Sequence, residues 1–432
     1  MIEKILDMAR RSADAAEVFC VESESRRAEF ENNRLKYITT KSVRGVGLRV
    51  IQGGRIGFSC TTDLSQPERL VENALESAKY GQEAKFEFPS SSQPASVRVH
   101  DPQVIDFPIE EGVKRTEDAI AEIMAAVPRA QCGAEVGKKF GRQRVINSAG
   151  LDVSFEHTDF DCDMSALLIR DGSLLWTGDH DSSCALLDVW ADHAGKIIAD
   201  IRASERELVP EPGGYPVIFT PNAVGALLIT FEQGVDGKLV QKQISPLTGK
   251  LGERIVDTEI TLTDDGTIDF AAGSCPIDDE GLPVRKNTLI EKGVLKQYLF
   301  DLQTAGMLGA EPTGSGMRGF QSQPRPGNTN LVIDAGNLPY EKMIKDMRRG
   351  LLVDQLLGAG QSNTLAGDFS VNVALGYLVE NGEIVGRVKD CMLAGNAFEA
   401  FTNIVGLGDK AVLKGSLMTP HICFESMNVA SG

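Results

Sequence analysis

Helix-like and strand-like patterns alternate along the first half of the chain. Apolar residues recur at helical spacing near the N-terminus, around Leu70 to Ala78, over 108–127 and over 188–204. Ser65-x-x-Glu68 matches a capping box at the start of the second of these helices. The intervening segments alternate loosely as strands do, and Gln52-Gly53-Gly54 is typical of a hairpin turn. The first half is therefore predicted to contain both helices and antiparallel strands.

Two breaks divide this pattern. Residues 82–106 are rich in serine, proline and glutamine and are predicted to be a linker. Pro210-Glu-Pro-Gly-Gly214 places two prolines and two glycines in five residues, which disfavours continuous secondary structure. After it, a short strand over 216–219 and an almost wholly apolar, buried helix from Ala223 to about Phe231 are predicted. Further strands turn at Lys292-Gly293 and Asn381-Gly382, with helices over 340–350 and 396–404.

Strands joined as hairpins, without regular βαβ units, favour an α+β fold with mixed, mostly antiparallel sheets. We expect two main domains with separate cores. The N-terminal α+β domain covers 1–209 and can divide into subdomains over 1–90 and 105–209. The C-terminal α+β domain covers 215–432.

Charge and composition exclude several classes of partner. The formal net charge of −17 disfavours binding to nucleic acids and to anionic membranes. No stretch approaches the roughly 18 apolar residues of a membrane helix, and the N-terminus lacks the apolar core of a secretory signal. The eight cysteines form no C-x-x-C pair and are predicted to be reduced, buried thiols. We therefore predict a cytoplasmic protein.

Metal-binding patterns are weak in this sequence. None of the five histidines lies three to five residues from another, so no helical zinc pair is present. Asp179-His180-Asp181, with Cys184 nearby, is interpreted as a polar turn, because neighbouring side chains point apart. Asp159-x-Asp161-x-Asp163 begins like a calcium loop but lacks its later glycine and glutamate. It is interpreted as the polar face of a strand.

Other catalytic patterns are equally sparse. Gly314-x-Gly316-x-x-Gly319 matches the letters of a dinucleotide fingerprint. The segments around it contain prolines and do not resemble the required strand and helix, so a flexible loop is predicted. A Ser-His-Asp triad stays open, because its members meet in space and not in sequence.

The order and spacing of several short segments resemble those of the TldD/PmbA family over essentially the whole chain. These segments are Glu29 to Tyr37, Gly45-Val-Gly-Leu-Arg-Val50, Ile277-Asp-Asp-Glu-Gly281, Asn287 to Lys296, Pro312-Thr-Gly-Ser-Gly316, Asn328-Thr-Asn330 and Leu378-Val-Glu-Asn-Gly-Glu383. The family pairs two related subunits, and in TldD a helix of the C-terminal half carries H-E-x-x-x-H. A cysteine in a later glycine-rich loop completes that zinc site.

The resemblance implies that this chain lacks the zinc site. The first histidine, the glutamate and the second histidine correspond to Ile229, Thr230 and Gly234. The cysteine loop corresponds to 405–414, which contains no cysteine, and Cys423 lies beyond it in a strand-like segment. The chain thus resembles PmbA, also called TldE. The resemblance implies no catalytic residues of its own, no metal and no cofactor.

The implied function is that of a non-metal subunit in a TldD/TldE-type metalloprotease that processes unfolded peptides. Its partner would be a TldD-like zinc protease subunit, and in isolation we expect a homodimer. One alternative is a stand-alone peptide-binding or regulatory homodimer, in line with the family's label as a modulator of DNA gyrase. Another is an enzyme with non-metal chemistry. Glu232, Asp279 and Glu280 are candidates for lining a peptide chamber, although the run Asp278 to Glu280 also reads as a solvated turn.

Overall fold

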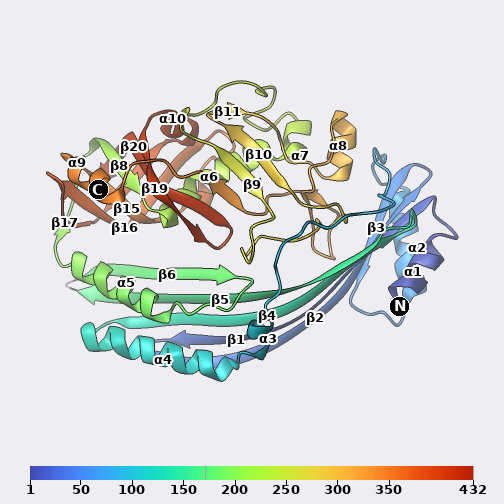
Figure 1. Ribbon diagram of the computed structural model, residues 1–432, viewed down its shortest axis with the longest axis horizontal. Coiled ribbons are helices and arrows are strands. Elements are labelled where there is room, and N and C mark those ends of the chain that lie inside the picture. The colour runs from blue at the N-terminus through green and yellow to red at the C-terminus, as the bar shows by residue number, and fades with distance from the viewer. Residues whose placement is uncertain (171, 432) are drawn as a thin grey trace.

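The computed structural model describes residues 1–170 and 172–431, which form two large sheets with helices around them (Figure 1). The helices of the first half are α1 (Ile2–Ala9), α2 (Pro67–Ala78), α3 (Pro102–Asp106), α4 (Ile109–Ala126) and α5 (Trp190–Ala203). Those of the second half are α6 (Pro221–Val235), α7 (Gly237–Gln241), α8 (Leu302–Leu308), α9 (Tyr340–Asp346), α10 (Ala397–Thr402) and the 3-10 helix η1 (Ala359–Gln361). This mixture of helices and mostly antiparallel sheets confirms the predicted α+β class.

The first sheet consists of long antiparallel strands that curve beneath the second half (Figure 1). In the described residues its order is β3-β2-β1-β4-β5-β6. The strands are β1 (Ala15–Glu31), β2 (Arg34–Gln52), β3 (Arg55–Thr61), β4 (Gln131–Asn147), β5 (Asp152–Arg170) and β6 (Ser173–Ser183). Strand β5 shows why the register is well defined: Phe160, Cys162 and Met164 are buried on one face. The aspartates between them lie on the other, so the predicted polar strand face is confirmed.

Helices cover the two ends of one face of this sheet. Helices α1 and α2 pack on Ala16, Val18 and Cys20 of β1. Helices α4 and α5 pack at the other end, where Ala28 and Phe30 belong to the same buried cluster. Because side chains alternate across a strand, all these even-numbered residues point to one face. The odd-numbered residues of β1 lie on the opposite face, where Glu17 contacts Arg318 of the second half.

The second sheet is mixed. Its main path in the described residues is β11-β10-β9-β14-β20-β8-β15-β16-β17-β7, with β18 joined to β16 and β20, and β19 joined to β20. The strands are β7 (Glu207–Leu208), β8 (Gly213–Phe219), β9 (Leu262–Asp265), β10 (Lys286–Glu291), β11 (Val294–Leu295), β14 (Leu331–Ile333), β15 (Arg349–Leu357), β16 (Asp368–Glu380), β17 (Glu383–Val388), β18 (Cys391–Asn396), β19 (Ile404–Lys414) and β20 (Leu417–Ser431). A separate pair joins β12 (Gly316–Met317) to β13 (Arg325–Pro326).

The sequence predicts a separate core for each half, and the structure does not have this arrangement. One buried cluster does lie wholly in the second half and includes the buried apolar residues of α6 from Ala223 to Val235. A second cluster, however, combines Phe160 and Trp190 of the first half with Leu375 and Tyr377 of the second. Helix α5 accounts for the difference, since it contacts both β6 and β17. The halves therefore share apolar packing, and a domain division between 209 and 215 stays a prediction.

Three smaller expectations can be compared with the structure. Of the eight cysteines, six are buried, Cys275 is half-buried and Cys60 is exposed, and none forms a disulfide. The predicted linker contains one short helix, α3, which begins after the side chain of Asp101 caps it. Among the described helices, none combines the length and the apolar character needed to cross a bilayer.

Asp264 of β9 makes the stability of the second sheet depend on pH. It is buried, and its carboxylate accepts hydrogen bonds from the backbone N–H and the hydroxyl of Thr329, at 2.6 and 2.7 Å. Burial raises the pKa of Asp264 from 3.8 to about 6, although these hydrogen bonds oppose the rise. The folded state therefore favours the protonated form, and this stabilising contribution, about 3 kcal/mol, is lost as the pH rises from 3.8 to 6.

We expect Asp264→Asn to gain stability relative to the natural protein as the pH rises from 4.5 to 7, measured by urea unfolding. Exposed Asp269 is the matched control. Hydrogen bonds from Arg98, the backbone one first, lower the pKa of Asp269 below its usual 3.8. Its contribution to stability therefore changes only below about pH 3.8, and Asp269→Asn should keep a constant stability relative to the natural protein from pH 4.5 to 7. Parallel pH profiles for Asp264→Asn and the natural protein would contradict the expectation.

Candidate functional site

Helix α6 carries the positions at which the resemblance places the zinc motif. Thr220 and Pro221 start the helix, and its apolar residues pack into the core of the second half. Ile229 is half-buried on the outer side, whereas Thr230 and Gly234 are buried. None of these three side chains is a zinc ligand.

The space beside Gly234 is filled by the segment that follows α7. A Cβ atom on Gly234 would lie 2.7 Å from Cδ1 and 3.0 Å from Cγ of Leu247, which is buried. The hydroxyl of Ser245 donates to the carbonyl oxygen of Gly234 at 2.6 Å and accepts from the backbone N–H of Leu247. A larger side chain at position 234 would displace this packed segment.

Glu232 lies on the half-buried side of the same helix, near Ile229. Burial raises the pKa of its carboxyl group. Within the described part of the chain it has no hydrogen bond or ion pair, so its carboxylate is free to meet a ligand. Its role in lining a peptide chamber stays a prediction.

The carboxylate run Asp278 to Glu280 is not a solvated turn, because Asp278 and Glu280 are buried and Asp279 is half-buried. Asp278 accepts from the backbone N–H groups of Glu280 and Leu282 and, through its other oxygen, from that of Gly316 at 2.9 Å. Asp278 therefore holds the loop around Gly316 in place.

The other two carboxylates of the run connect the halves. Asp279 accepts from the side chain of Gln143 on β4 at 2.7 Å and from the backbone N–H of Arg318 at 2.5 Å. Glu280 accepts from Arg49 of β2 at 2.8 Å and from the backbone N–H of Leu302 at 2.7 Å. Both predicted chamber residues are thus engaged in contacts within the chain, and their role in lining a chamber stays a prediction.

A buried network of two arginines and two glutamates forms the centre of this junction. Arg49 lies 2.8 Å from Glu280 and 3.1 Å from Glu17, and Arg318 lies 2.8 Å from Glu17. All four side chains are at most 2 % exposed. Phe19 lies under the guanidinium of Arg318 at 4.3 Å, which adds a cation–π contact. The formal charges of these four side chains cancel, which lowers the cost of burying them, although burial still raises the pKa of Glu280.

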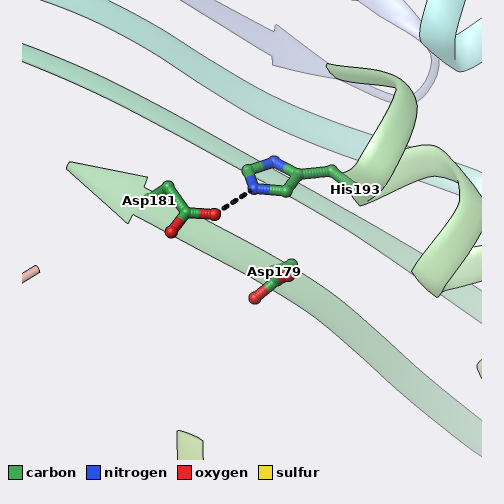
Figure 2. A group of neighbouring side chains, drawn as sticks. All are labelled: Asp179, Asp181 and His193. Atoms are coloured by element: carbon green, nitrogen blue, oxygen red, sulfur yellow. Dashed lines mark hydrogen bonds and ion pairs between the residues drawn. The ribbon is translucent and has the colours of Figure 1, made fainter. Parts of the chain in front are cut away.

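A second polar cluster lies at the other end of the first sheet, and Figure 2 shows three of its side chains, from β6 and α5. Asp179 and Asp181 of β6 and His193 of α5 place ligand-type atoms within 4.8 Å of one another. His193 Nε2 lies 2.8 Å from Asp181. Because Asp179 and Asp181 are two apart in a strand, they share one face, so the predicted polar turn is wrong.

Lys414, at the end of β19, lies between these two carboxylates. Its ammonium is 3.0 Å from Asp179 and 3.0 Å from Asp181. Burial opposes the charge on Lys414, but the two aspartates outweigh it and raise the pKa of the lysine. A metal ion held by these ligands would have to displace the ammonium, so we interpret the cluster as an ionic contact between the halves. The segment 405–414, expected to be a loop, is strand β19.

Sequence reasoning missed Arg49, Glu17, His193 and Lys414. A signal existed for the first two, since each is a charged residue inside an otherwise apolar strand segment. His193 and Lys414 look like ordinary residues of an amphipathic helix and a strand end. The fold alone brings them to β6.

Comparisons with known proteins agree with this architecture. The profile described as PmbA/TldA metallopeptidase C-terminal domain matches residues 212–431. The profile described as PmbA/TldA metallopeptidase domain 1 matches residues 16–78. The first of these alone covers half of the chain.

Relatives and solved structures extend the match over the rest. Metalloprotease PmbA of Escherichia coli O157:H7 is 25% identical, over 99% of this chain and 95% of the relative. The crystal structure of TldE from Thermococcus kodakarensis is 25% identical, covers all of both chains and has a TM-score of 0.90. A Thermotoga maritima structure described as a modulator of a DNA gyrase is also 25% identical, covers 99% of both chains and has a TM-score of 0.91. The chain therefore belongs to the PmbA/TldD metallopeptidase family.

Proposed function

We propose that this protein is the non-metal, TldE-like subunit of a two-component metalloprotease that acts on unfolded peptides. The observation that carries the proposal is the composition of α6, where Ile229, Thr230 and Gly234, which the resemblance assigns to the motif positions, offer no zinc ligand. Leu247 fills the space that a second histidine would need. Catalysis would then depend on a TldD-like partner that carries H-E-x-x-x-H, while this chain helps to hold the peptide.

An open strand edge supports a role in association. Strand β3 pairs with β2 only from Val46 to Gln52. Among the described strands, none pairs with the remaining part of β2 on that side, which includes exposed Leu35, Tyr37 and Ile38. Unpaired backbone groups beside apolar side chains are a template for main-chain pairing with another chain. We infer that this edge contributes to a contact with a partner subunit or a peptide.

The test is a cleavage assay with a quenched fluorescent, unfolded peptide and three samples: this chain, a TldD-like partner, and their mixture. We expect background cleavage by this chain alone and several times more cleavage by the mixture than by the partner alone. A partner with glutamine in place of its motif glutamate is the matched control and should leave the mixture inactive. Chelator-resistant cleavage by this chain alone would refute the proposal.

Light scattering of the same samples reports association. We expect a dimer in each case, with a contact above about 1,000 Å² in total. A monomeric mass that does not change on mixing would contradict the proposed pairing.

The second candidate is a stand-alone peptide-binding or regulatory homodimer. The similarity to the Thermotoga maritima protein described as a modulator of a DNA gyrase favours it. A stable homodimer that binds peptide and ignores the TldD-like partner would support this candidate over the first. The net charge of −17 argues that such regulation would act through protein contacts and not through DNA.

A further inference from the structure

A pocket of about 410 Å³ lies at the seam between the two halves, beside the end of α6. Arg49, Ile56 and Gln82 contribute to its wall from the first half. Lys238 and Lys242 contribute from the second, and Lys238 is four residues beyond Gly234. The volume lies within the range of about 300–1,000 Å³ that suits small ligands or a chain terminus. A folded partner would not fit.

The free charge of the pocket is positive. Lys238 and Lys242 are exposed and lie four residues apart at α7, so they are neighbours on one side of the helix. Neither forms an ion pair with any other residue that the structure describes. In a chain of net charge −17, two uncompensated ammonium groups facing one pocket indicate a site for an anion.

The other charged groups near the pocket are already engaged. Arg49 uses two nitrogens to bind Glu17 and Glu280. Asp301 accepts from the backbone N–H of Thr304 and thereby caps α8. Asp236 likewise caps α7, where it accepts from the backbone N–H groups of Lys238 and Leu239. Phosphate sites commonly use an arginine guanidinium or the N-terminus of a helix. Here both kinds of group already bind carboxylates of the chain, so they are not available to a phosphate.

Amide side chains make up much of the remaining polar wall, which includes Gln82, Gln241, Gln303 and Gln323. Gln303 is engaged with the backbone of Glu83 and Lys85. The other three have no side-chain hydrogen bond to the pocket's described surroundings. Free amides donate and accept at the geometry of peptide groups, so the lining suits a carboxylate attached to a peptide backbone.

We propose that this pocket binds the C-terminal carboxylate of the peptide, with Lys238 and Lys242 as the recognising cations. The inference rests on the proposed function, because it takes a peptide as the ligand. The pocket would prefer a peptide's free C-terminus over an internal peptide segment. Main-chain pairing at a strand edge cannot supply this preference. Substrates would then be oriented with their C-terminus at the end of α6.

The test uses fluorescence anisotropy with one N-terminally labelled, unfolded peptide in two forms, a free acid and a C-terminal amide. We expect the full-length protein to bind the acid about tenfold more tightly, the effect of one hydrogen-bonded charge. The double variant Lys238→Gln/Lys242→Gln should bind both forms equally. Lys286→Gln/Lys292→Gln, which removes two exposed lysines elsewhere, is the charge-matched control and should keep the preference.

Equal binding of the two peptide forms by the natural protein would overturn the inference, as would a preference that survives in the Lys238/Lys242 variant. Displacement of both forms alike by low concentrations of inorganic phosphate would also overturn it, since the pocket would then be a general anion site. Failure of the cleavage assay with this preference intact would count against the proposed function alone. Normal cleavage without the preference would count against the pocket alone.

Discussion

Arg49→Met should destabilise the protein by about 3–5 kcal/mol, the usual cost of leaving a buried charge without its partner. Arg49 is about 1 % exposed and holds Glu17 and Glu280, both fully buried. Arg318 can still neutralise Glu17, but Glu280 would keep only the backbone N–H of Leu302. Methionine replaces much of the packing of the arginine stem, so the loss reports mainly on charge. Urea unfolding at constant pH measures it.

The matched control is Arg44→Met on the same strand. Arg44 pairs with Glu22, and both side chains are about half exposed, so its removal should cost less than about 1 kcal/mol. Adding Glu280→Gln to Arg49→Met should restore part of the loss, because it removes the orphaned charge. Equal effects of Arg49→Met and Arg44→Met would show that the buried network does not hold the halves together.

Local signals in the sequence were sufficient for several turns and helices. The turn at Gln52-Gly53-Gly54 joins β2 to β3, and both glycines have positive φ. Asn381-Gly382 joins β16 to β17 in the same way. Such turns require backbone angles that few residues adopt, so composition identifies them. The resemblance to the TldD/PmbA family was likewise correct, because it rested on ordered segments and not on one motif.

Caps were harder to place than turns. Ser65 was predicted to cap α2, yet the residue before the helix is Gln66, which makes no side-chain cap. The backbone N–H of Ser65 instead bonds to the side chain of Asp63, in a turn that ends just before the helix. A Ser65 cap and an Asp63–Ser65 turn both satisfy polar backbone groups locally, so the sequence alone does not show which of the two forms.

Contacts between residues far apart in the chain could not be predicted from the sequence, for a different reason. Glu280 meets Arg49 across 231 residues, and Lys414 meets Asp179 across 235. Nothing in either neighbourhood specifies its partner. The position of a charge within an apolar strand indicates burial, but only the order of strands in the sheets and the docking of the halves fix the identity of the counter-charge. The same limit applied to the pocket at the seam.

Introducing histidine at position 234, which the resemblance assigns to the second motif histidine, should destabilise the protein. We expect Gly234→His to cost about 3 kcal/mol or more, because overpacking a filled core forces neighbours to move. Leu247, which occupies the space, is about 1 % exposed. Its backbone is held on both sides, since its N–H donates to Ser245 and its carbonyl oxygen accepts from Tyr298.

Two comparisons make this expectation specific. Ile229→His, at the half-buried first position, should cost less than Gly234→His, because no filled core has to move there. Leu247→Ala added to Gly234→His should recover part of the loss by opening the space. The triple variant Ile229→His/Thr230→Glu/Gly234→His should bind no stoichiometric zinc by elemental analysis, because its second histidine cannot reach the outer side of α6 without displacing the Ser245–Leu247 segment. A stably folded triple variant with one zinc per chain would show instead that the motif positions remain accessible, and that their ligands alone separate this chain from its zinc-binding relatives.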